Sequence, residues 1–142
     1  MEVAAVRQQI LLAIDRAKRA AADRRGVNDE ASRDYEAFLD QLAVPLFRQA
    51  ANVLRVEGYL FNLFTPGGSV RLMSDRSADD YIELVLDTTG ETPAVMGRAS
   101  RTWGRRTALT EQPLNPGVPI RELTEEDVLK FLLKALEPFV EK

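Results

Sequence analysis

The chain has 142 residues, a formal net charge of -3, no cysteine and no histidine. This length predicts a single domain spanning 1–142. Without cysteine there is no disulfide or thiolate metal site, and without histidine the commonest general base and a preferred zinc ligand are missing. We therefore expect no cofactor and no metal, and an enzyme would have to use carboxylates, lysine, tyrosine or oxygen-bound magnesium.

No run of the chain approaches 18 apolar residues, so the sequence predicts no membrane span. The N-terminal segment 1–20 contains Asp15 and several basic residues, which interrupt the apolar core that a targeting segment needs. We read this segment as a helix of the mature fold, and a cytoplasmic protein is the default expectation.

Two helices are expected before residue 56. The first runs from Val3 to about Arg25, where apolar residues recur at spacings of 3-4-3-4-3, which indicates an apolar helix face or a coiled-coil seam. Gly26 follows basic residues and predicts the end of this helix. A second helix over about 29–55 contains Pro45, which predicts a kink or break near 43–44. The short link at Gly26 predicts an antiparallel helical hairpin.

After Gly58 the apolar period changes to 2, which predicts strands. "TPGG" separates two such runs, with Pro66 and Gly67 suited to the central positions of a turn. Pairing around that turn places Phe61 near Leu72. We expect this pair of strands to begin an antiparallel meander.

The segment 80–103 predicts a second hairpin, which turns near Gly90. In its register Glu83 lies opposite Arg98 and Arg101 lies opposite Asp80. The apolar face of the hairpin carries the residues Ile82, Leu84 and Leu86 opposite Ala99, Gly97 and Val95, with Trp103 in the core beyond them.

The segment 106–112 is either a fifth strand or a continuation of the fourth past Gly104. A helix over 124–139 follows, with Thr124 as its N-cap and three acids in its first turn. The expected fold is α+β: an N-terminal antiparallel helical hairpin, a four- to five-stranded antiparallel meander and a C-terminal helix.

The stretch "GRASRTWGRR", Gly97 to Arg106, carries four arginines and a tryptophan. It suits either an anion site or a sheet face whose arginines pair with nearby acids. We favour pairing, because an acidic run precedes the stretch and the whole chain is acidic, unlike most nucleic-acid-binding domains. No specific nucleic acid is expected. The "TPGGS" loop lacks the lysine of a phosphate loop, and "SDRSADD" lacks the glycine of a calcium loop.

The second face of the predicted sheet mixes apolar and charged residues, so we expect it to be covered by the chain's own helices, by a second copy or by a ligand. The candidate ligand-binding residues on it are Arg71, Tyr81, Glu83 and Arg98. The candidate interface residues are Leu60, Phe64, Met73 and Met96 on this face, with Val3, Val6 and Ile10 on the first helix.

The function that we expect is a non-catalytic one, a protein-interaction or self-association module. A homodimer is expected because a long helical hairpin would overhang the sheet and expose the apolar residues near its end. A protein partner is a further possibility. The alternatives are a small-ligand or anion-binding domain that uses the arginine-bearing face, and a carboxylate- or magnesium-dependent enzyme.

Overall fold

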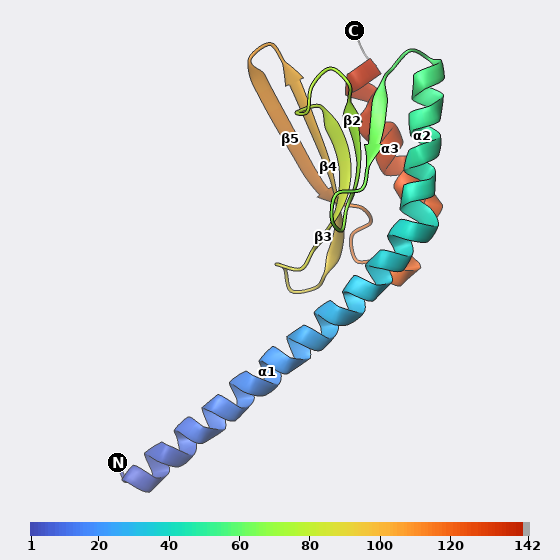
Figure 1. Ribbon diagram of the computed structural model, residues 1–142. Helices are drawn as coiled ribbons and strands as arrows, with labels where there is room; N and C mark the ends of the chain where they lie inside the picture. Colours follow the sequence, from blue (N-terminus) through green and yellow to red (C-terminus); the bar gives the residue numbers. More distant parts are fainter. Residues whose placement is uncertain (141–142) are drawn as a thin grey trace.

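The computed structural model describes residues 1–140 and has an α+β fold (Figure 1). A long helical stretch precedes one antiparallel sheet, and a last helix packs on that sheet. The elements in chain order are α1 (Val3–Phe38), the π-helical turn η1 (Leu39–Ala43), α2 (Val44–Val56), β1 (Phe61–Phe64), β2 (Val70–Ser74), β3 (Tyr81–Asp87), β4 (Ala94–Trp103), β5 (Arg106–Pro113), the 3-10 turn η2 (Ile120–Glu122) and α3 (Glu125–Val140).

The expected helical hairpin is wrong, because α1 runs through Gly26 without a turn. Glycine costs about 1 kcal/mol relative to alanine inside a helix, which is too little to end one flanked by good helix formers. Gly26 also keeps a negative φ, so it does not adopt the left-handed conformation of a helix terminus. The 36 residues of α1 span about 54 Å.

Pro45 bends the long helix without breaking it. The π-helical turn η1 immediately precedes it, and the Val44 N–H bonds to the Leu39 carbonyl, five residues back. Pro45 then lies in the first turn of α2, where its missing N–H and its ring are tolerated. The sequence predicted a kink or break near 43–44, and the structure has the helical irregularity there with no break.

The five strands form an antiparallel meander in the order β1-β2-β3-β4-β5. The expected pairing of Phe61 with Leu72 is wrong, since Phe61 lies opposite Ser74. The turn is displaced by one residue, with the Ser69 N–H donating to the Pro66 carbonyl at 2.8 Å and Gly68 at φ +79°. The pairing therefore shifts by two positions, which leaves every side chain on its expected face.

The β3–β4 register agrees with the sequence prediction, including Glu83 opposite Arg98. At the turn, the Thr89 hydroxyl and N–H donate to Asp87 at 2.6 and 2.9 Å, and these hydrogen bonds lower the pKa of that exposed carboxyl. A turn at Gly104, with φ +60°, makes β5 a separate fifth strand.

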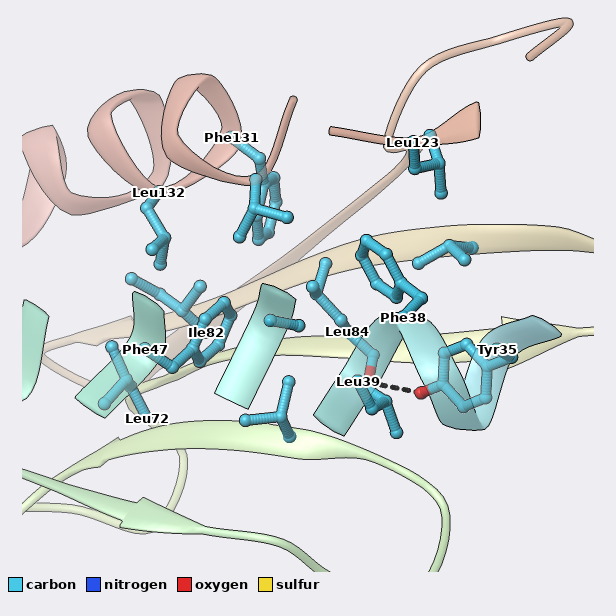
Figure 2. Close-up of a cluster of buried hydrophobic side chains, with 14 of the residues drawn as sticks. Tyr35, Phe38, Leu39, Phe47, Leu72, Ile82, Leu84, Leu123, Phe131 and Leu132 are labelled. Atoms are coloured by element: carbon cyan, nitrogen blue, oxygen red, sulfur yellow. Dashed lines mark hydrogen bonds between the residues drawn. The ribbon is translucent and has the colours of Figure 1, made fainter. Parts of the chain in front are cut away.

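Helices α2 and α3 pack on one face of the sheet and bury the core there (Figure 2). Phe47 of α2 and Leu132 of α3 meet strand residues such as Ile82 and Leu84, and all four are almost fully buried. On β4, Gly97 lies beneath the Phe131 ring, and a Cβ added at this position would overlap that ring. The glycine therefore sets how closely α3 approaches the sheet.

The N-terminus of α3 is capped by Thr124, as the sequence predicted. The Thr124 hydroxyl accepts from the Asp127 N–H at 3.3 Å, and Asp127 accepts from the Thr124 N–H at 2.9 Å. Asn115 donates to the other carboxylate oxygen of Asp127 at 3.0 Å, which ties the preceding loop to the helix. The reciprocal bonds satisfy donors that a helix start otherwise leaves free.

Tyr35 fastens the last turns of α1 to the sheet. Its buried hydroxyl lies 2.7 Å from the Gly68 carbonyl and 3.3 Å from the Leu84 carbonyl (Figure 2). Burial, with a smaller contribution from the nearby negative charge of Glu83, raises the pKa of Tyr35 far above its ordinary value. Ala31 and Phe38 complete the buried end of the helix.

Candidate functional site

The first 28 helical residues of α1 (3–30) project away from the sheet, and we call them the free segment (Figure 1). Nearly all of them are exposed, and burial begins at Ala31. Within residues 1–140, no helix combines the length and the apolar character that crossing a membrane requires. The free segment is therefore a long helix with little tertiary packing within the described chain.

Seven large aliphatic side chains lie exposed on the free segment. The predicted interface residues Val3, Val6 and Ile10 are among them, with exposed fractions of 85%, 37% and 55%. The other four are Leu11, Leu12, Ile14 and Val27. Helices in globular proteins draw most of their stability from burying such an apolar face, and here the face has no partner within the chain.

A cavity of about 580 Å³ lies at the base of the free segment, and we call it the basal groove. Residues Val27, Glu30, Ala31 and Asp34 of α1 form one wall. The opposite wall comes from residues 92–95 and 113–120 and from Leu123. The groove has an apolar floor and two carboxylates at one side. Sequence reasoning missed it, although the "PLNPGVP" loop and two acids four residues apart on a helix were visible signals.

The sheet face opposite the core, which we call the open sheet face, carries the predicted ligand and interface residues. Helices α2 and α3 both pack on the core side, so these helices do not cover it. Leu60 and Phe64 are exposed there, with exposed fractions of 54% and 43%, while Met73 and Met96 are half-buried. Of the covers that the sequence suggested for the apolar residues of this face, a second copy and a ligand remain, together with a protein partner.

Four charged residues cross the open sheet face as a ladder over four neighbouring strands. Arg71 on β2 contacts Glu83 on β3 at 2.7 and 2.8 Å, and Glu83 lies 3.9 Å from Arg98 on β4. Arg98 Nε lies 3.3 Å from a Glu111 carboxylate oxygen on β5, without the alignment of a hydrogen bond. The Arg71 guanidinium also stacks 4.2 Å from the centre of the Tyr81 ring. The structure thus brings the four predicted ligand-binding residues together.

The charges of this ladder already neutralise one another. Only 4% of the Glu83 side chain is exposed, and two guanidiniums compensate its buried charge. The ladder does not line the basal groove. An incoming anion would have to displace a carboxylate that is already bound, so the arrangement favours a structural role for these residues over anion capture.

Arg101 of the Gly97–Arg106 stretch behaves differently from the sequence prediction. The expected pairing of Arg101 with Asp80 is wrong, because Asp80 accepts instead from the N–H and hydroxyl of Thr102 at 2.7 and 2.9 Å. Arg101 lies 5.8 Å from the centre of the Trp103 ring. Trp103 is 48% exposed and so is not a core residue, because β4 extends past the part of the sheet that the helices cover.

Acid clusters suited to metal binding or to catalysis were the basis of the third expected function. Among residues 1–140, no group of three or more Asp, Glu, Cys or His side chains is placed to hold a metal ion. Comparison with protein-family models, with curated proteins and with solved structures gives no significant match to this chain. Its function therefore has to be inferred from its own residues.

Proposed function

We propose that this protein is a non-catalytic self-association module whose copies join through the free segment of α1. The observation that carries the proposal is the exposure of seven large aliphatic side chains on a helical segment that is exposed along nearly all of its length. Full burial of such a side chain contributes about 1.5–3 kcal/mol. Burial of even several of them is comparable with the free energy that holds a typical dimer together.

The helical state of the free segment gives a second reason. Isolated helices are only marginally stable in water, because nucleation is costly and each added residue gains little. The one ion pair within this segment, between Asp15 and Arg19 at 2.9 Å, is exposed and contributes little. Packing against another helix would supply the missing stabilisation.

The open sheet face supports contact with protein more than binding of a small anion. Exposed Leu60 and Phe64 flank a charge ladder that is already neutralised. Half-buried Met73 and Met96 add flexible apolar surface, which is common where proteins meet. A protein partner on this face is therefore a second candidate, independent of the free segment.

Sedimentation equilibrium at tens of micromolar protein tests self-association. We expect a mass above the 15.9 kDa of one chain. The double variant Ile10→Gln, Ile14→Gln should shift the mass toward the monomer, because it removes two apolar side chains while keeping good helix formers. The matched control is Val53→Gln, Val56→Gln, which changes two exposed aliphatic residues of α2. A wild-type mass of one chain would refute the proposal.

A further inference from the structure

A heptad frame runs without interruption along the free segment and into the basal groove. Its a positions are Val3, Ile10, Ala17, Arg24 and Ala31, and its d positions are Val6, Ala13, Ala20, Val27 and Asp34. We call these a and d residues together the seam. The α1 residues that line the groove occupy positions d, g, a and d of the same frame. The apolar stripe of the free segment therefore ends inside a cavity.

We propose that two copies pair through their free segments as an antiparallel helix pair, with the N-terminal turn of each seated in the basal groove of the other. The proposal rests on the proposed function and deepens it by naming the partner surface, the direction and the register. The occupant of the groove is thus a second copy of this chain.

Charge disfavours the parallel arrangement. In a parallel pair, a positions face a positions, so Arg24 would meet the partner's Arg24 inside the seam. The flanking g and e positions would place Arg16 beside the partner's Ala21, with no opposite charge to offset the repulsion. A parallel pair would therefore bury like charges, and its edges would offer one oppositely charged pair only, Glu2 beside the partner's Arg7 at the outer end.

One antiparallel register matches both size and charge. It sets Ala17 opposite the partner's Ala20, so that the alanines let the helices approach closely at the two-fold axis. Arg24 then lies opposite the partner's Ala13, which leaves room for its long side chain to reach water. Arg16 lies beside the partner's Asp23, and symmetry makes this ion pair twice.

Sliding the helices by one heptad in either direction removes that match. One slide places Arg16 beside the partner's Arg16, and the other places Asp23 beside the partner's Asp23. Like charges at these positions destabilise a helix pair. The matched register is also the one that overlaps the whole free segment, and the overlap continues to Asp34.

The matched register delivers the end of one chain to the groove of the other. The partner's Val6 lies at the level of Ala31, and the partner's Val3 lies at the level of Asp34, at the mouth of the groove. Gln9 lies beside the partner's Glu30, which is one of the groove carboxylates. The side-chain amide of Gln9 can donate a hydrogen bond to it. The residues that fill each groove thus come from the N-terminal turns of the other copy's α1.

Two leucines lie outside the seam. Leu11 and Leu12 occupy positions b and c and stay exposed in an antiparallel pair.

The absence of native cysteine makes disulfide trapping a direct test. In the matched register Ile10 lies opposite the partner's Val27, so a mixture of Ile10→Cys and Val27→Cys chains should form a mixed disulfide dimer under mild oxidation. Each variant alone should form little, because in that register two copies of position 10 lie about 25 Å apart, far beyond disulfide reach. The pair Gln9→Cys with Glu30→Cys should behave likewise and reports on the groove.

The matched control mixes Leu12→Cys with Val27→Cys, since position 12 lies off the seam and should trap weakly. All substituted positions are exposed in the single chain, and circular dichroism confirms that each variant folds. Efficient self-disulfides of Ile10→Cys would overturn the antiparallel arrangement but leave self-association standing. A monomeric mass without any disulfide would overturn both. Trapping at 10–27 without trapping at 9–30 would overturn the seating in the groove.

Discussion

Arg71 donates from Nε to a carboxylate oxygen of Glu83 at 2.8 Å, and this bond joins β2 to β3, with the guanidinium over the Tyr81 ring. Glu83 is the buried member of the pair, and its other oxygen faces Arg98. The carboxylate therefore binds the guanidiniums of both neighbouring strands. Its removal would leave two partly buried cations without their common partner.

Glu83→Gln should lower the free energy of unfolding by about 1–3 kcal/mol, since it removes the charge that compensates Arg71 and Arg98. The arginines are about one-third exposed, which keeps the loss below that of a fully buried pair. Denaturant unfolding at fixed protein concentration measures it. Glu111→Gln, at the exposed end of the ladder, is the control and should change stability by less than about 1 kcal/mol. Equal effects for the two variants would contradict the central role of Glu83.

Tyr35→Phe should cost about 0.5–1.5 kcal/mol, because the Gly68 carbonyl loses its 2.7 Å donor. The variant should also change the alkaline limit of stability. The pKa of Tyr35 is raised in the folded chain, so its stabilising contribution is complete below about pH 10, the ordinary tyrosine pKa. It is lost as the pH rises toward the folded pKa.

Unfolding curves of the wild type and Tyr35→Phe from pH 9 to 11.5 test this linkage. Above about pH 10 the wild type should lose stability more steeply than the variant. Parallel curves for the two proteins would show that Tyr35 ionisation is not coupled to folding.

Gly97→Ala should destabilise the protein by about 1–3 kcal/mol, because its Cβ would overlap the Phe131 ring and push α3 away from β4. A second substitution, Phe131→Leu, should recover part of that loss when the two are combined. Gly26→Ala is the matched control, since open space surrounds a Cβ there, and it should not lower the unfolding midpoint. The double variant tests steric overlap: additive losses for the two changes would exclude it.

Asp23→Arg should weaken self-association several-fold, because it would place two arginines beside each other at two symmetry-related places along the helix pair. Combining it with Arg16→Asp should restore the wild-type dissociation constant within about twofold, since the charges are exchanged and the ion pairs re-form. Sedimentation velocity over a concentration series provides the constants. Failure of the exchanged variant to recover would argue for another register.

The sheet could be predicted from the sequence where side-chain alternation was strong. Ile82, Glu83 and Leu84 fix the β3–β4 register, because a slip by one residue would place Glu83 among the core residues. The β1–β2 register was less constrained, because a shift by two keeps every residue on its face. At that hairpin the turn glycines decided the pairing, and local rules placed the turn one residue too early.

The helical region was harder to predict from the sequence, because its local stop signals are weak compared with the tertiary packing that holds α1 in place. Gly26 carried a stop signal worth about 1 kcal/mol, while Tyr35 and Phe38 anchor the same helix to the sheet far downstream. The basal groove joins α1 to segments 92–95 and 113–120, so local patterns could not show that these distant segments meet. The contact of Glu83 with Arg98 was predictable from the register, but the contact with Arg71 and the burial of Glu83 were not.

A continuous α1 also makes the free segment a spacer of fixed length. Two copies joined antiparallel along about 40 Å of helix would hold their sheets at opposite ends of the helix pair, so the dimer would be elongated. The pair-distance distribution from small-angle X-ray scattering would then show two maxima, one for distances within each sheet unit and one for distances between the units. The separation of the two sheets would be set by the number of residues in the helix, so an insertion of one heptad would lengthen it by about 10 Å.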